Sequence, residues 1–280
     1  MVASIIADSA CDVGKDLIDG ENCTIEHVPL NLQIGDTVFV DDENLDLDNY
    51  INQMEASTTA VKTSAPAPAL FFERFKAASE NIFAVTLSSK LSATYQSAMA
   101  AKDMYLEECG KKFIHIFDSL TASVGEGVIA LKIAELAKAG EGAMEIVDKV
   151  NQFMAGMRTY IVLDKFDNLV KTGRIKPYIA KVASFLNVKP ICVDENGEIK
   201  MLDKARGFTK AVSKLVNIIK ESHPDIENRV IAITHVKAMD KALALKEEFT
   251  AALRPKDIVI TECRGITTTY AARGGVVVAL

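Results

Sequence analysis

Short apolar runs rich in Val, Ile and Phe alternate along the chain with segments whose apolar residues follow helical spacing. The apolar runs predict strands at Val2–Ala7, Thr24–Ile34, Thr37–Val40, Ile82–Leu87, Phe113–Phe117, Tyr160–Leu163, Val188–Val193, Val230–Thr234, Asp257–Thr261 and Val276–Leu280. The helical spacing predicts helices at Leu47–Ala56, Leu70–Ser79, Ala93–Glu108, Val124–Ala139 and Ala143–Met157. We expect Thr37–Val40 to form a hairpin with the strand before it, Asp46 to cap its helix, and Ser57–Pro68 to be a loop.

This alternation of strands and helices is typical of α/β proteins and predicts a largely parallel sheet. The helical pattern ends near Gly156, and the strand pattern restarts at Tyr160. We therefore expect two α/β domains, residues 1–158 and residues 159–280, each with a largely parallel sheet. The chain has 280 residues, which is enough for one large α/β domain or two ordinary ones.

Charge and composition narrow the class of function. The net charge of -6 provides no basic field for nucleic acid. The chain has no apolar run of membrane-spanning length, and its start reaches Asp8 without a basic region. Its five cysteines contain no Cys-x-x-Cys pair, which favours reduced, buried thiols over disulfides or a metal site. We expect a cytoplasmic protein without a metal, a cofactor or a membrane span.

Two loops rich in hydroxyl side chains precede predicted helices. The first, Thr86–Thr94, carries five hydroxyls at the end of a strand, where open α/β sheets bind ligands. The helix after it begins with unpaired N–H groups that favour an anion. The second runs from Ser57 to Ser64 and includes Thr63. If the two loops converge, they suit a carboxylate; the alternative is that one Ser caps the helix and the others are ordinary loop residues.

Other motifs are weaker. Gly125-Glu-Gly127-Val-Ile-Ala130 matches a dinucleotide fingerprint, but it does not directly follow a strand, so close helix packing or a loop near a ligand explains it better. Asp41-Asp42-Glu43 is expected to be a solvated turn. Sequence signatures of enzymes are mostly absent, and the four histidines are isolated. His235 follows a predicted strand and is placed to reach a ligand at the strand end.

Basic residues occur in two turns. Lys171 and Arg174 belong to a loop before a helix that starts at Pro177, and Arg206 lies near the turn Glu195-Asn-Gly197. These residues are either solvated helix entrances or docking points for an acidic partner.

Taken in order, these segments resemble the DegV family. The similar stretches are Ile5–Ser9, Val61–Pro66, Leu87–Ala98, Phe117–Ser119, Gly125–Gly127, Leu169–Ile175, Val188–Ile191, Gly197, Lys204–Arg206 and His235. The resemblance covers nearly the whole chain. It implies a two-domain α/β protein with a ligand cleft between the domains, in which residues 1–158 hold a carboxylate and residues 159–280 cover an acyl chain.

The resemblance also implies a function. One long-chain fatty acid would bind in the cleft, and a separate fatty acid kinase would convert it to an acyl phosphate for phospholipid synthesis. The family's carboxylate-binding Thr and Ser match Thr63 and Ser92. The expected ligand-binding set is Thr63, Ser64, Ser92, Ala93, Thr94, Arg206 and His235, and the expected partner-docking residues are Lys171 and Arg174.

One family motif is missing. The family's His-Thr-Gly-x-Gly precedes the last strand, but this chain has Thr267–Gly275 there, without a histidine. Tyr270, Arg273 or the threonines are the candidate substitutes. We expect a binding protein and not an enzyme. Two hypotheses compete with a carrier: an enzyme that acts on a small carboxylate or phosphorylated substrate in the same cleft, and a regulatory protein that uses the bound lipid as a signal.

Overall fold

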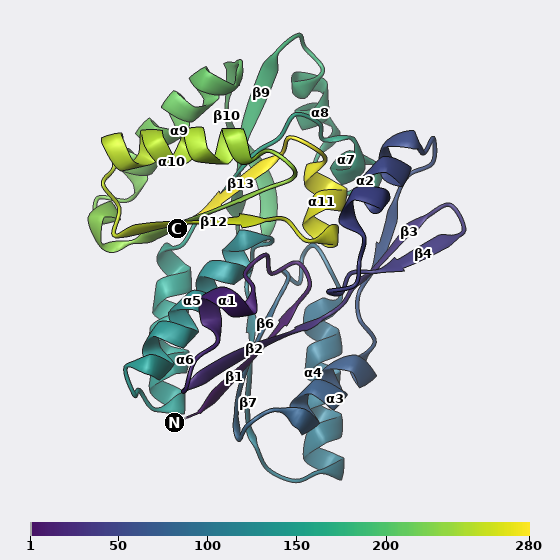
Figure 1. Cartoon of the computed structure of the whole chain (residues 1–280), viewed down its shortest axis with the longest axis vertical. Coiled ribbons are helices and arrows are strands. Elements are labelled where there is room, and N and C mark those ends of the chain that lie inside the picture. The colour runs from purple at the N-terminus through teal and green to yellow at the C-terminus, as the bar shows by residue number, and fades with distance from the viewer. Residues whose placement is uncertain (1) are drawn as a thin grey trace.

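The first sheet of the protein is fully parallel. The structure, a computed structural model, describes residues 2–280. The sheet has the strand order β2-β1-β6-β7, and all of its pairings are parallel. Its strands are β1 (Ala3–Asp8), β2 (Cys23–Val28), β6 (Asn81–Thr86) and β7 (Phe113–Asp118). Because the strands run in the same direction, the loops after β1, β6 and β7 meet at one edge of the sheet (Figure 1).

The second sheet is mixed and has the order β10-β9-β8-β13-β11-β12. Its strands are β8 (Thr159–Val162), β9 (Val188–Glu195), β10 (Glu198–Arg206), β11 (Val230–His235), β12 (Asp257–Glu262) and β13 (Val276–Ala279). Only β11 and β12 pair in parallel, so the prediction of a largely parallel second sheet is wrong. Asn196 and Gly197 have φ values of 52° and 83° and make the tight turn that forces β10 antiparallel to β9.

A third, antiparallel sheet has the order β4-β3-β5. It contains β3 (Asn31–Ile34), β4 (Thr37–Val40) and β5 (Lys62–Ser64). The predicted hairpin to Thr37–Val40 is confirmed, but the predicted strand Thr24–Ile34 is divided into β2 and β3 around Pro29. The predicted loop Ser57–Pro68 contains β5, which brings Thr63 into register with Leu32.

The predicted helices are present, with ends within two residues of those expected. The helices are α1 (Lys15–Ile18), α2 (Leu47–Ala56), α3 (Pro68–Ala77), α4 (Thr94–Glu108), α5 (Val124–Lys138), α6 (Ala143–Gly156), α7 (Asp167–Lys171), α8 (Pro177–Ala183), α9 (Phe208–Ser222), α10 (Met239–Ala252), α11 (Gly265–Ala271) and the 3₁₀ turn Ile226–Asn228. The Asp46 side chain accepts a hydrogen bond from the Asn49 amide at 3.0 Å, as expected for the cap of α2.

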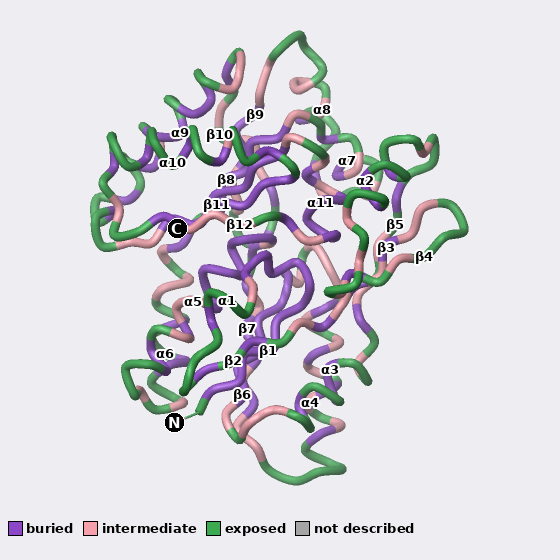
Figure 2. Tube along the Cα trace, viewed as in Figure 1, coloured by how far each residue is buried: buried purple, intermediate pink, exposed green. Residues whose placement is uncertain are grey.

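Helix α5 lies between the parallel and the mixed sheet and is buried against both. Helices α3 and α4 cover the other face of the parallel sheet, whereas α9 and α10 cover the outer face of the mixed sheet. One apolar cluster includes Ala3 of β1 and Ala279 of β13, so the two sheets share a core (Figure 2). The division into residues 1–158 and 159–280 stays a prediction.

The glycine motif at the start of α5 serves helix packing. A Cβ atom at Gly127 would lie 2.3 Å from Cγ2 of Val13. One at Gly125 would lie 2.4 Å from Oγ1 of Thr159 and 2.6 Å from Oγ1 of Thr121. The absence of side chains therefore lets α5 approach both neighbours, which confirms the packing interpretation of this motif.

Candidate functional site: a cavity between the parallel and mixed sheets

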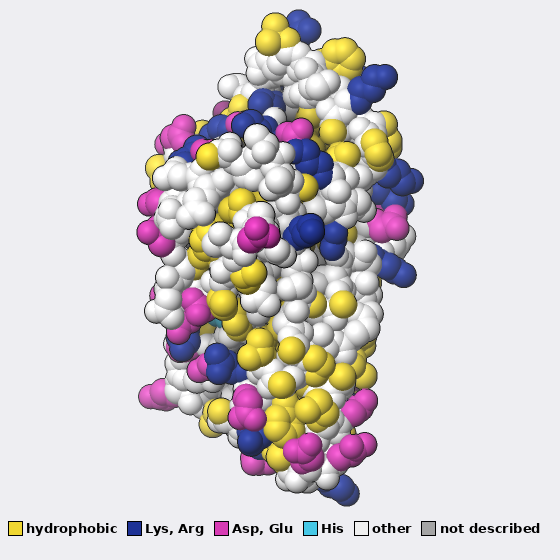
Figure 3. All heavy atoms as spheres, turned by 90° about the vertical axis from the view of Figure 1, so that its right-hand side faces the viewer, with side chains coloured by type: hydrophobic (Ala, Val, Ile, Leu, Met, Phe, Trp, Pro, Cys, Tyr) yellow, Lys and Arg dark blue, Asp and Glu magenta, His cyan; other side chains and the backbone are white. Residues whose placement is uncertain are grey.

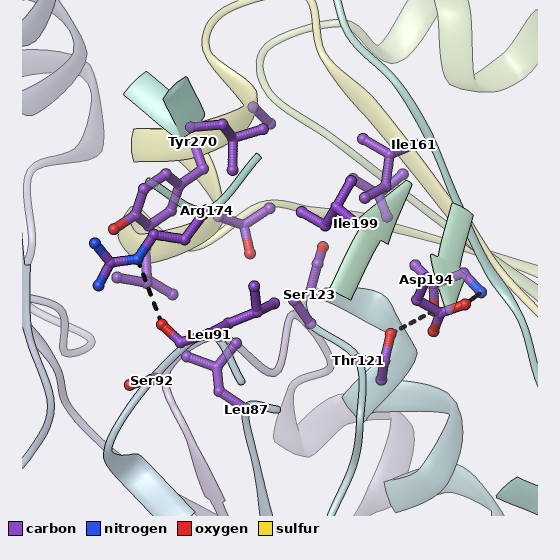
Figure 4. A pocket seen from close by; sticks show the side chains of 18 of the residues that line it. Leu87, Leu91, Ser92, Thr121, Ser123, Ile161, Arg174, Asp194, Ile199 and Tyr270 are labelled. Atoms are coloured by element: carbon purple, nitrogen blue, oxygen red, sulfur yellow. Dashed lines mark hydrogen bonds between the residues drawn. The ribbon is translucent and has the colours of Figure 1, made fainter. Parts of the chain in front are cut away.

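A cavity of about 280 Å³ lies where the loops after the parallel strands face the mixed sheet. Its apolar lining is Ala10, Leu30, Ala65, Leu87, Leu91, Ala93, Leu120, Ala122, Ile161, Leu163, Leu169, Ile199, Ile266, Ala271 and Val277, with Tyr270. The polar lining is smaller and consists of Thr63, Ser92, Thr121, Ser123, Thr159, Arg174, Asp194, Glu198 and Thr267 (Figure 4). For scale, an apolar cavity of about 150 Å³ already binds benzene.

One end of the cavity carries two pairs of hydroxyls. Thr63 Oγ1 lies 2.7 Å from the Tyr270 hydroxyl, and Ser92 Oγ lies 2.8 Å from Thr94 Oγ1. Thr63, Ser92 and Tyr270 line the cavity, and Thr94 is buried behind them at the start of α4. A bond within a pair uses one hydroxyl proton, so each pair keeps a second proton for a ligand. The two hydroxyl-rich loops of the sequence thus converge on one space.

Arg174 lies at this same end, between Tyr270 and Leu91 (Figure 4). Its Nη1 donates to the Thr172 carbonyl at 2.6 Å and its Nε to the Leu91 carbonyl at 3.4 Å. It is the only Lys or Arg among the lining residues of the described chain. The guanidinium therefore places a positive charge beside the hydroxyl pairs, whereas the sequence had assigned it to partner docking.

Of the other expected site residues, only Ala93 lines the cavity. Ser64 is exposed on β5, with its Oγ 3.5 Å from Nδ2 of Asn31. Arg206 is exposed on β10, and Lys171 is exposed at the end of α7. Neither of these basic side chains belongs to the lining.

His235 is buried at the end of β11 but is not a lining residue. Its Nδ1 accepts a hydrogen bond from the Ala238 amide at 3.3 Å. Burial lowers the pKa of the imidazole, so the neutral form is favoured. The imidazole therefore packs against the turn after β11, and it does not line the cavity.

The stretch that replaces His-Thr-Gly-x-Gly contributes Tyr270 to the cavity. Arg273 instead points to the surface, where Nε is 3.1 Å from Oε1 of Glu55. Thr267 also lines the cavity, and among residues 2–280 its buried Oγ1 has no hydrogen-bond partner. Of the candidate substitutes, Tyr270 and Thr267 therefore face the cavity and Arg273 does not.

Two buried carboxyl groups fix α11, the helix that carries these residues. Asp41 accepts hydrogen bonds from the Gly265 and Ile266 amides, each at 2.8 Å. Asp12 accepts from the Arg264 amide at 2.7 Å and from the Ser123 hydroxyl at 2.7 Å. Asp41 is 1% exposed, so the expectation of a solvated turn is wrong for this residue. The helix N-terminus needs acceptors, and these carboxyl groups supply them.

Burial dominates the protonation of these acids. It raises the pKa of Asp12 to about 7 and also raises that of Asp41, although hydrogen bonds to the backbone oppose the shift. The neighbouring Asp8 shows the same effect, with a pKa raised to about 7. No sequence pattern predicted this cluster, because Asp8 and Asp12 come close to Asp41 only in the folded chain.

The opposite end of the cavity is polar as well. Thr121 Oγ1 donates to Thr159 Oγ1 at 2.7 Å, and the Thr159 amide donates to Asp194 Oδ1 at 2.8 Å. Figure 4 shows Thr121 and Asp194 across the cavity from Ser92, Arg174 and Tyr270. Burial raises the pKa of Asp194. None of these three residues was expected from the sequence.

Fold and site together define a mixed α/β protein with a largely apolar cavity that is polar at both ends. The chain belongs to the DegV family. The family model, described as an uncharacterised protein of the DegV family, matches residues 3–280. This confirms the resemblance found in the sequence.

Relatives match the chain over nearly its full length. A DegV domain-containing protein of Streptococcus pyogenes serotype M1 is 33% identical over 277 residues, or 98% of each chain. A DegV family protein from Ruminococcus gnavus, solved with vaccenic acid, is 35% identical with a TM-score of 0.93 and 99% of each chain covered. The Streptococcus pneumoniae Fatty Acid Kinase (Fak) B3 protein, loaded with linoleic acid, is 32% identical with a TM-score of 0.92, and the match covers 100% of this chain and 99% of that one.

Two further properties concern residues 2–280. No helix in this range is long and apolar enough to cross a bilayer. The same residues contain no cluster of three or more His, Cys, Asp or Glu side chains arranged to hold a metal ion. The cysteines are free thiols, and all except Cys109 are buried.

Proposed function

We propose that the chain binds one long-chain fatty acid in the cavity between its sheets. The carboxylate lies at the end formed by Thr63, Ser92, Tyr270 and Arg174, and the acyl chain follows the apolar lining toward the mixed sheet. The observation that carries this proposal is the convergence of two hydroxyl pairs on an otherwise apolar cavity. The relatives solved with vaccenic and linoleic acid support it.

The energetics of such a complex are favourable. Burial of about 14 methylene groups at ~0.8 kcal/mol each offers roughly 11 kcal/mol of transfer free energy. Association and ordering costs remove part of it, and submicromolar binding remains within reach. The carboxylate has to keep its hydrogen bonds inside the protein, because a buried unpaired charge is expensive. Hydroxyls from Thr63, Ser92 and Tyr270 meet this demand, and Arg174 adds a compensating charge.

These positions suggest which part of the chain binds the carboxylate and which part covers the acyl chain. Residues 1–158 supply the Thr63 and Ser92 loops, and residues 159–280 supply the mixed sheet that covers the acyl chain. Tyr270 and Arg174 also come from the second part, so both parts contribute to the carboxylate end. A ligand at this place would be enclosed from two sides.

Native mass spectrometry of the purified protein, followed by lipid extraction, tests the proposal. We expect one fatty acid of 14 to 18 carbons per chain, about the length considered above. A protein that is free of lipid and takes up no added fatty acid would refute the proposal. Conversion of the bound acyl group to a new product by the pure protein would favour the enzyme hypothesis.

We further propose that a separate fatty acid kinase phosphorylates the bound carboxylate. The relation to the Fatty Acid Kinase B3 protein supports this proposal. So does the surface of α8 and the residues after it, where Tyr178, Phe185 and Leu186 are exposed close to Lys171 and Lys181 in the sequence. Figure 3 shows hydrophobic and basic side chains intermixed across the upper part of this face.

Lys171 is the better probe of docking, because Arg174 also lines the cavity. We expect Lys171→Glu to retain bound fatty acid and to slow kinase-dependent formation of acyl phosphate, since an acidic surface on the kinase would be repelled. Lys111→Glu, at an exposed site before β7, serves as the matched control. Equal rates for both variants would remove Lys171 from the docking surface.

A further inference from the structure

The far end of the cavity is closed by side chains that satisfy one another. The Thr159 amide donates to Asp194 Oδ1 at 2.8 Å. The hydroxyls of Thr121 and Thr159 lie 2.7 Å apart, and both also hydrogen-bond to the Asp194 carboxyl. A buried polar group that has its partners is stable without a ligand, whereas breaking such a group apart is unfavourable. Thr121, Thr159 and Asp194 therefore form a polar plug that needs nothing from an acyl chain.

Apolar side chains lie in front of the polar plug. Ile161 of β8 and Ile199 of β10 point into the cavity at the same end as Asp194 (Figure 4). The methyl end of an acyl chain that starts at Thr63 and Ser92 would pack against these two isoleucines. Within the cavity, each further methylene group gains about fourfold in affinity from burial. That gain ends where the chain meets the polar plug.

On its other side the polar plug borders a second space. Asp194 is half-buried, and it is the one residue of the described chain that lines both the cavity and a cleft of about 440 Å³. The lining of this cleft includes the exposed residues Arg158, Glu195 and Leu202. Val193 and Leu202 give part of the cleft an apolar surface. Asp194 therefore separates the acyl cavity from space that is open to solvent.

Helix α5 keeps the polar plug from moving aside. A Cβ atom at Gly125, in the first turn of α5, would lie 2.4 Å from Thr159 Oγ1 and 2.6 Å from Thr121 Oγ1. The two threonines are therefore enclosed between the helix and the mixed sheet. A longer acyl chain would have to push Asp194 out toward the cleft and break its hydrogen bonds. Since a close-packed wall yields little to extra volume, we expect the limit on chain length to be sharp.

We propose that the polar plug, and Asp194 above all, sets the upper limit on the length of the acyl chain that the cavity accepts. Asp194 is then the residue that determines specificity for chain length. Replacing it with a small side chain joins the cavity to the cleft and admits longer fatty acids, whose additional methylene groups pack along Val193 and Leu202. The inference rests on the proposed function, because the carboxylate has to occupy the opposite end.

Competition binding with the delipidated protein tests this inference. The ligands are saturated fatty acids from about 12 to about 24 carbons, a range that spans the length the cavity would bury. For the unmodified protein we expect the affinity to rise by roughly fourfold per added carbon up to one length and then to fall. For Asp194→Ala the rise should continue past that length, so that the first acid beyond the limit binds roughly tenfold more tightly to the variant.

Further variants locate the effect. Asp194→Asn keeps the size of the side chain and an oxygen acceptor, so the limit should stay where it is. Ile199→Phe fills the space in front of the polar plug and should move the limit to shorter acids. Glu195→Ala is the matched control, because this exposed neighbour lines the cleft but not the cavity. Its affinities should follow those of the unmodified protein at every chain length.

The outcomes separate the two proposals. An affinity that rises through the longest acid in the unmodified protein would show an open far end and overturn the inference while fatty acid binding stands. A folded Asp194→Ala protein with an unchanged limit would overturn it as well, and so would Ile199→Phe without a shift to shorter acids. If Asp194→Ala does not fold, Asp194→Ser takes its place, since it keeps an oxygen acceptor in a smaller side chain. If no acid of any length binds, the proposed function itself fails.

Discussion

At the scale of single residues, the proposed carboxylate end depends on hydroxyls that come from distant parts of the chain. Thr63 and Tyr270 are separated by 207 positions but lie 2.7 Å apart. Ser92 and Thr94 approach each other through a local turn instead, in which the Ser92 amide donates to the Ser88 carbonyl at 3.0 Å. Loss of a neutral donor to a carboxylate costs more than loss of an ordinary hydrogen bond, since the acceptor is charged.

We expect Thr63→Val combined with Ser92→Ala to weaken fatty acid binding by about 100-fold, which corresponds to about 3 kcal/mol for two charge-assisted hydrogen bonds. Isothermal titration of the delipidated variant measures this. Thr58→Val, at an exposed threonine in the loop before β5, the strand of Thr63, is the control and should bind normally. An unchanged affinity in the double variant would move the carboxylate to another place.

The buried acids give stability a dependence on pH. Burial raises the pKa of Asp8 to about 7 from its usual 3.8, although the Ala10 and Leu87 amides donate to it. Between these values the folded protein keeps a proton that the unfolded chain has lost. The unfolding free energy therefore falls as pH rises from about 4 to 7 and is level outside that window as far as this group is concerned.

Asp8→Asn should reduce this slope, because an amide does not titrate. Urea unfolding of the variant and of the unmodified protein at pH 4.5, 6 and 7.5 would show it as a shrinking difference between the two proteins as pH rises. The raised pKa values of Asp12 and Asp41 still contribute to the pH dependence of stability, so the slope decreases without disappearing. A difference that is constant with pH would mean that Asp8 is ionised in the folded state.

At the scale of elements, α11 is the piece on which the cavity most depends. It has only seven residues, and six of them are buried. Its N-terminus is bonded to Asp41 and its middle to Tyr50, whose hydroxyl lies 2.6 Å from Thr269 Oγ1. A helix this short has little stability of its own, so these tertiary contacts fix its position and with it the position of Tyr270.

Asp41→Ala should lower the unfolding free energy by about 1–3 kcal/mol, because two buried amides lose their acceptors. The same variant should bind fatty acid more weakly, since Tyr270 loses its fixed place beside Thr63. Glu43→Ala, in the same acidic run but exposed, is the matched control. Denaturant unfolding measures the change in stability, and calorimetric titration measures the change in fatty acid affinity. An Asp41→Ala protein as stable as the control would contradict the role assigned to this carboxyl.

At the scale of the whole molecule, the cavity lies where the edge of one sheet faces another sheet. Loops after β1, β6 and β7 line it from one side, and β8, β9, β10 and β13 line it from the other. A ligand there touches both sheets, so its binding and the stability of the folded chain are linked.

Removal of bound lipid should therefore lower the melting temperature. At a free ligand concentration of 100 times Kd, ligand binding contributes about 2.7 kcal/mol to the unfolding free energy. Scanning calorimetry before and after delipidation, and again after adding back the acid identified by extraction, measures the effect. A short-chain acid such as acetate is the control and should not restore the melting temperature.

The sequence by itself determined many of the elements and indicated that two hydroxyl-rich loops converge. Apolar periodicity located most strands and the helices α2 to α6, since each element needs an apolar face wherever it packs. It did not predict α9 or α10. The hydroxyl-rich loops pointed to Thr63 and Ser92, because both loops precede helices, and the loop of Ser92 also follows a parallel strand. The family resemblance indicated the same two residues.

The tertiary structure decided the strand directions of the second sheet and the contacts that enclose the cavity. The direction of β13 and the hairpin of β9 with β10 depend on strand pairing, which local periodicity does not encode. The burial of Asp41, the contact of Tyr270 with Thr63, and the polar far end with Asp194 all join residues separated by many positions in sequence. A short-range pattern reports which face of an element is apolar, whereas the partner that covers that face, and the cavity left between them, exist only once the chain has folded.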